Sequence, residues 1–355
     1  MTTLGHNRSL VGSAVLALDD PRWSALVAAH PDATAFHLPQ WSAAIAECYG
    51  FRAFVLAALS PEGTVGAAIP VIAVPRPWGG RRAAKWVTLP FTDHCPPLLA
   101  GDGDENEWSA FVADTASTAG VRRVQVRAAV GSDARAVAVR HLLALTDDPD
   151  AAYRRFHRSQ VQRNIRRAER DGVVVRTAEA RTDLTEIFYR LHLQTRRRQG
   201  VPVQPRRLFE LIWRHLIAPG HGTVLVAEHG GRPIAAAVFL RHNGTVIYKY
   251  GASDSSAWSL RPNHALLWHA VRAACAAGDS VFDWGRTDFD NAGLRAFKAA
   301  WGAVEQPLRY TTLGAPAAAS DLGASRAARV LGATIRHSPA WVCTAAGAAL
   351  YRFTA

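Results

Sequence analysis

The sequence predicts an α/β (α+β) protein made of two tandem mixed-sheet domains and a helical tail. The chain has 355 residues, which is too long for one compact core and suits two domains of ordinary size. Short apolar strands alternate with amphipathic helices over residues 14–313, and the second half repeats the element order of the first more regularly. We place the domains at 1–147 and 148–313, and a linker with an amphipathic tail at 314–355.

The first half begins with a short strand and two helices, and then forms a β-hairpin. The turn Ser60-Pro61-Glu62-Gly63 separates the two alternating hairpin strands. A polar turn at residues 146–150 marks the domain boundary. The predicted strands are 14–18, 54–59, 65–72, 85–89 and 121–126, the predicted helices are 21–29, 41–48 and 108–118, and a further element covers 137–145.

The second half contains a three-stranded antiparallel meander. Its turns are His229-Gly230-Gly231 and His242-Asn243-Gly244, and a helix that stops at Gly278 follows it. One strongly basic helix is expected to open this half. The predicted helices are 151–170, 184–200, 205–216, 263–277 and 292–300, and the predicted strands are 173–176, 223–229, 234–241, 245–250, 280–284 and 308–313.

The tail after Leu313 carries two amphipathic patterns behind a small-residue linker. Three arginines, Arg326, Arg329 and Arg336, surround Val330, Leu331 and Ile335, and Trp341, Val342 and Leu350 follow Pro339. Two interpretations stay open. The tail packs on its own domain, which we favour, or it lies on an anionic membrane face as a basic amphipathic helix with tryptophan.

The composition is that of a soluble globular protein with an excess of positive charge. The chain has 41 basic and 29 acidic residues, a net charge of +12, and three lysines, Lys85, Lys249 and Lys298. The excess favours a polyanionic partner such as a phosphate-rich substrate, RNA or an anionic membrane, the alternative being a generic basic surface. The four separated cysteines fit reduced thiols, and no segment resembles a signal peptide or membrane span, so we expect a cytoplasmic protein without a metal site.

The segment 282–302 has the composition of a ligand site. A strand carries Asp283, Gly285 permits a tight backbone, and Arg286 follows at the strand's end, where open sheets place ligands. Lys298 lies about two helical turns further on, and its compact charge suits a phosphate or a developing oxyanion. The alternatives are that Lys298 is a solvated helix residue and that Asp283 is a buried carboxylate holding Arg286.

The basic helix presents four arginines on one face. Arg163, Arg166, Arg167 and Arg170 follow the spacing i, i+3, i+4, i+7, opposite Tyr153, Val161, Ile165 and Ala168. Guanidinium groups this close repel one another unless an anion neutralises them, so we predict an anion site for an RNA backbone or a lipid phosphate. A solvated helix compensated by Glu169 and Asp171 is the alternative.

Several motifs together resemble the Fem-like branch of the acetyltransferase (GNAT) superfamily, which includes FemAB-type peptidyltransferases. The most specific are Phe-Asp-Trp-Gly-Arg at 282–286, Gly-Leu-Arg-Ala-Phe-Lys at 293–298 and Pro-Leu-Arg-Tyr at 307–310. Weaker matches lie at 36–41, 89–98, 248–253 and 261–263. The resemblance covers residues 14–313 and implies two tandem GNAT-like domains.

The resemblance implies an acyltransferase that forms an amide with an amine of a cell-envelope, glycan or small-molecule acceptor. The expected acyl donor is aminoacyl-tRNA or acyl-CoA, used as a co-substrate with no tightly bound cofactor. By this resemblance Lys298 matches the lysine that binds donor phosphate and stabilises charge, Asp93 matches an acidic residue of the acceptor cleft, and Arg286 lies nearby. The residues expected to bind substrate are Asp283, Trp284, His37, Trp41, Tyr248, Tyr250 and Asn263.

Two departures from the family pattern limit the choice of donor. The long coiled-coil arm of cell-wall members has no counterpart here, and the glycine-rich turn by which ordinary acetyltransferases bind CoA pyrophosphate does not follow the meander. A non-catalytic protein that binds a phosphate-bearing glycan, lipid or RNA therefore remains the alternative function.

Overall fold

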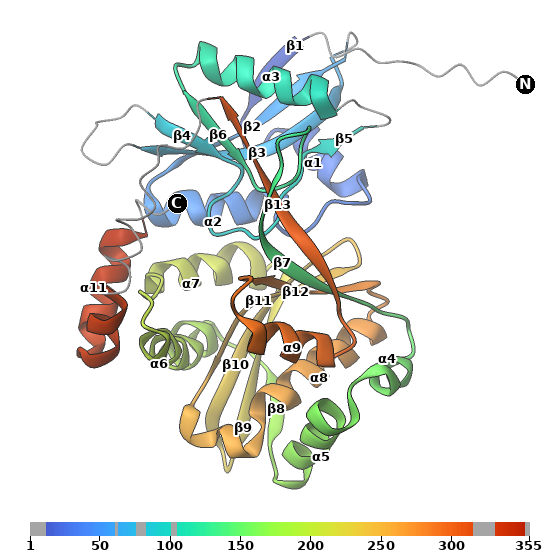
Figure 1. Ribbon diagram of the computed structural model, residues 1–355, viewed down its shortest axis with the longest axis vertical. Coiled ribbons are helices and arrows are strands. Elements are labelled where there is room, and N and C mark those ends of the chain that lie inside the picture. The colour runs from blue at the N-terminus through green and yellow to red at the C-terminus, as the bar shows by residue number, and fades with distance from the viewer. Residues whose placement is uncertain (1–11, 61–62, 76–82, 101–104, 315–330, 352–355) are drawn as a thin grey trace, which may run out of the picture. The chain divides into compact units, whose positions relative to one another are not determined.

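The computed structural model divides the chain into two compact units (Figure 1). The first unit takes in Met1–Val137 and Leu308–Ala317, and the second takes in Ala138–Pro307 and Ala318–Thr354. These units differ from the predicted division at 147 and 313, because the strand before residue 147 pairs within the second unit and the last strand ends in the first. The structure describes residues 12–60, 63–75, 83–100, 105–314 and 331–351.

The first unit is a mixed sheet covered by helices on both faces (Figure 1). Its strand order is β1-β2-β3-β4-β6-β13, with β5 paired to β3. One face packs against α3 through Trp86, Trp108 and Val112, and α1 and α2 contact the sheet through β2 and β3. The elements are β1 Gly12–Leu16, α1 Pro21–Ala29, α2 Pro39–Tyr49, β2 Arg52–Leu59, β3 Val65–Pro75, β4 Ala83–Val87, β5 Leu98–Leu99, α3 Glu105–Thr118, β6 Arg123–Val126 and β13 Val304–Gly314.

The second unit is also a mixed sheet between helices, in the strand order β7-β12-β11-β10-β9-β8. The predicted meander is confirmed, because β10 pairs antiparallel with both β9 and β11, and β12 then joins β11 in parallel. Its strands are β7 Arg135–Ala144, β8 Val174–Thr177, β9 Gly222–His229, β10 Arg232–His242, β11 Thr245–Ser253 and β12 Val281–Thr287. Its helices are α4 Pro149–Arg155, α5 Arg163–Arg170, α6 Tyr189–Gln199, α7 Arg206–Ile212, α8 Pro262–Ala276 and α9 Ala292–Ala300.

The helices of the second unit form two layers. On one face α4, α5 and α8 enclose a core that includes Phe156, Ile165 and Phe239. On the other face α6 contacts β10 and β11. The site described below lies where β11 and β12 end and α8 begins.

The basic helix predicted over 151–170 is broken in the structure. α4 ends at Arg155, Phe156 adopts an extended conformation, and a π-helical segment, Arg158–Gln162, leads into α5. The break has two causes: the side chain of His157 caps the next segment by accepting from the Gln160 amide, and the His157 amide donates to the Ala300 carbonyl at 2.8 Å. This long-range bond has no local sequence signal.

The described part of the tail packs on its own unit, as we favoured. The helix α11, Ala340–Leu350, lies against α6 (Figure 1), and Ile335 and Cys343 are fully buried beside Val203. Arg326, Arg329 and Val330 lie outside the described residues. Among the residues that the structure describes, no helix is both long and apolar enough to cross a bilayer.

Glycine at position 347 is required by close contact between α11 and the chain at Val203. A Cβ built on Gly347 would lie 1.8 Å from the Val203 carbonyl oxygen, whereas one on Gly293 in α9 meets nothing within 4 Å. We therefore expect Gly347→Ala to lower the free energy of unfolding by about 1–3 kcal/mol, despite the helix preference for alanine. Gly293→Ala should be neutral or stabilising. Urea unfolding of both variants checks this, and equal effects would contradict the packing.

Candidate functional site

The strands β11 and β12 stop pairing partway along their length. Their parallel ladder runs from Thr245–Val281 to Ile247–Asp283 and ends there. Each strand then has a bulge: Lys249 is an extra residue against β10, and β12 gains one residue against β7 between Asp283 and Arg286. A bulge bends and twists its strand, so two bulges at one level separate the strands beyond. Beyond this point the two strands do not pair with each other, and the Gly285 amide and the Gly285 and Arg286 carbonyls bond within the protein, to Asp283 and Lys298.

Lys298 supports the bulge in β12 from beneath. Its side chain is 3% exposed, and its ammonium donates to the carbonyls of Gly285 at 2.9 Å and Arg286 at 3.2 Å. The alternative of a solvated lysine is therefore wrong. Lys298 lines neither of the two cavities described here. Its direct action on a substrate stays a prediction.

Asp283 and Arg286 complete the bulge. The buried Asp283 carboxylate accepts a hydrogen bond from the Gly285 amide at 2.8 Å, and Gly285 has a φ of 68°, which a side chain would strain. Arg286 forms an ion pair with Asp288 at 2.7 Å. The Phe-Asp-Trp-Gly-Arg motif thus builds a fixed turn of backbone at the end of β12.

Two predicted tyrosines lie on opposite faces of the bulge in β11. Tyr248 packs against Phe239 and Trp284, and burial raises its pKa to about 12. Its hydroxyl lies over Gly251, where an added Cβ would come within 1.7 Å of it. Tyr250 instead faces Phe209 and His192, and Trp284 is 2% exposed. These aromatic residues form the walls behind the opening between β11 and β12.

A cavity of about 160 Å³ lies at the N-terminus of α8. It is lined by Trp258, Arg261, Pro262, Asn263, His264 and Phe297. At this helix start Pro262 has no amide N–H and the His264 amide donates to the Arg261 carbonyl at 3.0 Å, so the positive charge of the cavity comes mainly from the Arg261 guanidinium. Trp258 and Asn263 also donate to the Ser253 hydroxyl at the end of β11, at 3.0 and 3.4 Å. The cavity thus places a helix start and the Arg261 guanidinium beside two aromatic rings, Trp258 and Phe297.

His264 is held as a neutral imidazole in this cavity. Its Nε2 lies 3.1 Å from the Gln160 carbonyl, which only accepts, so Nε2 carries the proton and Nδ1 is an acceptor. Burial and the nearby Arg261 charge lower its pKa to about 4. The ring stacks on Trp301.

The hydrogen bond between His264 and the Gln160 carbonyl also connects the cavity to the basic helix α5, because Gln160 lies just before that helix. The apolar face predicted for the basic helix is confirmed by the burial of Ile165 and Ala168 on α5 and of Val161 in the segment before it, and Tyr153 on α4 is half-buried. Of the arginines, Arg166 donates to the Tyr153 hydroxyl at 3.1 Å and Arg167 pairs with Asp171 at 3.3 Å. Arg163, Arg166 and Arg170 are exposed. None of the four lines either cavity, so their anion site remains a prediction about the surface.

In the first unit, His37 and Trp41 hold the loop that contains Asp93. His37 is fully buried with contacts to the Thr34 amide and the Pro96 carbonyl, and Trp41 donates to the Thr92 hydroxyl at 2.8 Å. Neither side chain is accessible to a substrate in this structure. The prediction that they contact substrate directly is therefore corrected: they support the loop. The Asp93 carbonyl accepts from Tyr310 at 2.8 Å.

The same loop contains backbone strain. Leu89 and Phe91 both have left-handed φ angles, 64° and 61°, without being glycine. Such residues cost about 1–3 kcal/mol each and concentrate at ligand sites. The strain makes the Asp93 loop a candidate for a functional role.

The structure thus brings some predicted residues together and adds others. Lys298, Asp283, Trp284, Arg286 and Tyr248 surround the two bulges. Of the predicted set only Asn263 lines the cavity at α8. Trp258, Arg261, His264 and Phe297 were missed, although the Arg-Pro-Asn sequence is a typical helix start with proline in the first turn.

Comparison with known proteins agrees with this architecture. Residues 155–298 match the model of an acetyltransferase (GNAT) domain. No curated protein sequence matches the chain. Among solved structures, FemX aligns with a TM-score of 0.65 at 15% identity, over 84% of this chain and 96% of its own.

Two further structures share the fold. L-PGS from Bacillus licheniformis aligns with a TM-score of 0.54 at 14% identity, over 91% of this chain and 99% of its own. A tandem GNAT protein from the clavulanic acid biosynthesis pathway aligns with a TM-score of 0.50 at 13% identity, over 86% and 99%. The chain therefore contains a GNAT domain and has the fold of Fem-like proteins, as the motifs predicted.

The buried position of Lys298 predicts a structural effect of its removal. Lys298→Met leaves two buried carbonyls without their donor, so we expect the free energy of unfolding to fall by about 2–4 kcal/mol. Arg295→Met on the same helix removes a solvent-exposed pair with Glu305 and should have a much smaller effect. Urea unfolding compares the two. An unchanged midpoint for Lys298→Met would show that the lysine does not hold the bulge.

Proposed function

We propose that this protein is an N-acyltransferase that takes an aminoacyl group from tRNA and transfers it to an amine. One observation carries the proposal: a cavity with a helix N-terminus, Arg261 and Asn263 lies beside the point where β11 and β12 separate. A phosphate-bearing donor fits this combination, because the helix end and the guanidinium bind phosphate while the open strand ends accept the chain that carries the acyl group.

Acyl-CoA and aminoacyl-tRNA share this phosphate chemistry, and the basic helix favours tRNA. Arg163, Arg166 and Arg170 are exposed on α5, and the hydrogen bond between Gln160 and His264 connects this helix to the cavity. A row of guanidinium groups beyond a phosphate cavity suits a long polyanion better than a single pyrophosphate.

The proposed reaction forms an amide without a covalent enzyme intermediate. The acceptor amine attacks the ester carbonyl of the donor, the new C–N bond forms, and the C–O bond to the ribose breaks as a proton passes from the amine to the leaving oxygen. Backbone N–H groups at the separated strand ends face the developing oxyanion. Lys298 holds the bulge that positions them and adds positive charge behind it.

The remaining predicted residues keep separate roles in this proposal. Asp93, in the strained loop of the first unit, orients or deprotonates the acceptor amine. Arg286 stabilises negative charge next to the bulge. Both are tested by loss of turnover at unchanged stability in Asp93→Asn and Arg286→Gln.

The donor is identified by binding and by transfer. Purified protein is titrated with charged tRNA and, separately, with acetyl-CoA, and transfer to an amine is followed with labelled acyl group. We expect tRNA binding that weakens steeply with salt, and a roughly 10- to 100-fold rise in Kd for Arg261→Gln, which loses a charge-assisted contact. Arg272→Gln removes an exposed cation from the same helix, outside the cavity, as control.

Three results would contradict the proposal at different levels. If the protein binds acetyl-CoA but not tRNA, the assigned donor changes to acyl-CoA, while the assignment as a transferase stands. Binding of tRNA without any transfer would favour the non-catalytic alternative. Equal affinity of Arg261→Gln and the unaltered protein for both donors would remove the cavity from the site.

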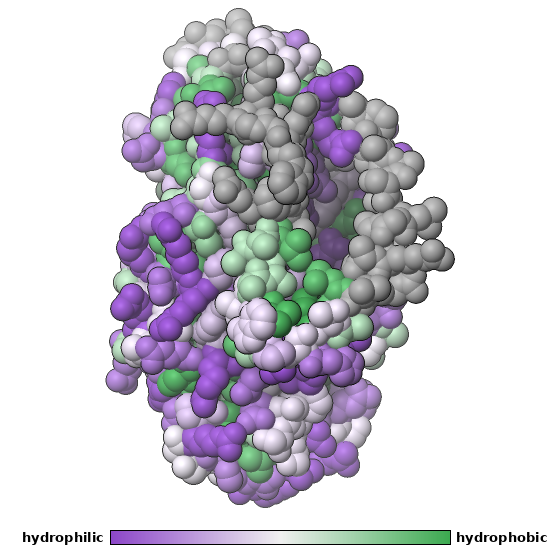
Figure 2. Space-filling model, turned by 90° about the vertical axis from the view of Figure 1, so that its left-hand side faces the viewer, coloured by the Kyte–Doolittle hydropathy of each residue, from purple (hydrophilic) through white to green (hydrophobic). Residues whose placement is uncertain are grey.

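We further infer that the acceptor belongs to a membrane or cell-envelope surface, and that α11 contacts it. Trp341 is 69% exposed on a helix with no charged residue, and Arg336 is exposed next to it. Figure 2, which views the side where α11 lies, shows apolar residues bordered by hydrophilic ones. A tryptophan between apolar surface and arginine suits the interface of an anionic bilayer.

Vesicle binding tests this contact. We expect the protein to bind vesicles of anionic phospholipid and not neutral ones, and Trp341→Ser to weaken the partition about tenfold, because the indole is no longer buried in lipid. Val174→Ser removes another exposed apolar side chain, on β8, and should leave binding unchanged. Binding that ignores both lipid charge and Trp341 would contradict the assignment.

A further inference from the structure

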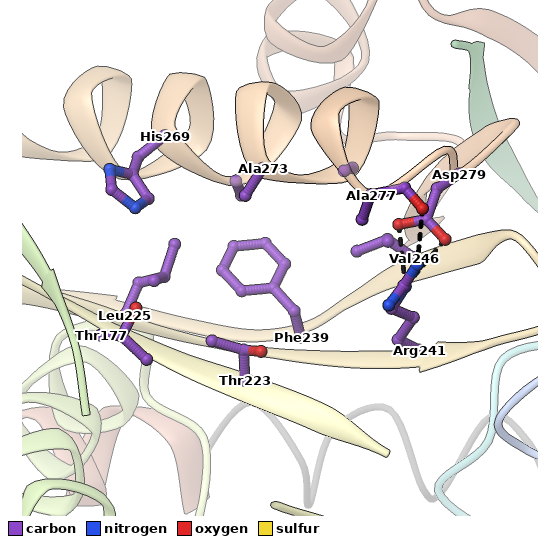
Figure 3. Close-up of a pocket in the computed structure, with 12 residues that line it drawn as sticks. Thr177, Thr223, Leu225, Phe239, Arg241, Val246, His269, Ala273, Ala277 and Asp279 are labelled. Atoms are coloured by element: carbon purple, nitrogen blue, oxygen red, sulfur yellow. Dashed lines mark hydrogen bonds and ion pairs between the residues drawn. The ribbon is translucent and has the colours of Figure 1, made fainter. Parts of the chain in front are cut away.

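The second unit has a larger cavity, separate from the one at the start of α8. Its volume is about 280 Å³, and it lies between α8 and the sheet (Figure 3). The two cavities share no lining residue, since the larger one begins at His269 on α8 and the smaller one ends at His264 on that helix. The proposed donor site therefore leaves this cavity unused.

The cavity exists because α8 presents alanine to the sheet over its C-terminal half. Ala270, Ala273, Ala274 and Ala277 face it from the helix. Across from them the floor is formed by larger side chains, including Leu225, Phe239 and Val246 (Figure 3). A helix and a sheet pack about 10 Å apart when full-sized side chains fill the layer, and a methyl group does not reach across it. Because these four positions are alanine, an apolar groove is left between α8 and the sheet, and it is open to solvent, since Ala273, Ala277 and Thr223 are exposed.

The polar groups at the two ends of the cavity carry little net charge. At one end Asp279 binds Arg241 through both carboxylate oxygens, at 2.8 and 2.9 Å, so the guanidinium charge is compensated there (Figure 3). At the other end the His269 side chain points from α8 toward the sheet (Figure 3). Burial and the Arg272 charge lower the pKa of His269, so it is neutral at pH 7. Thr177 and Thr223 add hydroxyl groups to the floor.

We propose that this cavity binds a small neutral amphiphile, with a chain or ring against the alanine face and a hydroxyl or amide near His269. An apolar cavity of about 150 Å³ accepts benzene, so 280 Å³ fits a ligand of about ten non-hydrogen atoms. A carboxylate is disfavoured, because the cation that lines the cavity is already paired with Asp279. The binding depends on the second unit alone and stands apart from the proposed donor and acceptor.

Thermal unfolding with 1-octanol as probe tests the cavity. Binding to the folded state raises Tm, by about 4 °C when the probe is tenfold above its Kd. Ala273→Leu places a side chain in the cavity and should abolish this rise. Ala276→Leu makes the same change on the exposed side of α8, away from the cavity, and should keep it. Octanoate at pH 8 has the same chain with a charged head and should raise Tm less.

The results of these measurements distinguish a ligand site from an unoccupied groove, and a neutral ligand from a charged one. A rise in Tm in the unaltered protein and in Ala276→Leu, lost in Ala273→Leu, supports the site. No rise, or the same rise in Ala273→Leu, overturns it. A larger effect of octanoate than of octanol overturns the assignment to a neutral ligand. The donor-binding assay described above is independent of each result.

Discussion

The buried ammonium of Lys298 is the interaction on which the open end of the second sheet depends. A bulge in β12 removes two backbone carbonyls from the ladder, and a buried carbonyl without a donor is destabilising. The ammonium of Lys298, on the following helix, donates a hydrogen bond to both carbonyls. Its own burial would be unfavourable without those two acceptors. The strand, the bulge and α9 are therefore interdependent, and the separation of β12 from β11 follows from this arrangement.

This arrangement explains which parts of the fold were predictable. The meander, α8 and α9 have local signals: turn glycines, alternation and a proline in the first turn of α8. The break between Phe156 and His157 depends only partly on a local contact, the cap of Gln160 by His157, and its second bond comes from the distant Ala300. The same is true of the cavity at α8, where His264 depends on a carbonyl 104 positions away. Local periodicity determines elements, and contacts distant in sequence determine where those elements are interrupted.

The candidate site was predicted in composition more than in geometry. Lys298 was identified as exceptional because lysine is rare in this chain, and the structure shows it buried where a solvated residue was the alternative. The motif resemblance pointed to the segment that forms the bulge, without predicting the bulge or indicating that its residues support backbone. His37 and Trp41 show the same kind of error. These motif residues were expected to contact a ligand, and the structure shows them buried, where they support a strained loop. Sequence patterns record which residues matter, whereas burial and hydrogen bonding separate direct from indirect roles.

The tail lies outside the motif pattern and yet contributes to the core of the second unit. Ile335 and Cys343 complete a small core with Val203, and Gln204, the next residue, hydrogen-bonds His192 at 2.8 Å behind Tyr250. A segment outside the motif pattern has thus become an internal support of the wall behind the strand ends. A protein shortened to the shared part would expose Val203 and loosen that wall. The folded second unit therefore extends past the end of the motif pattern.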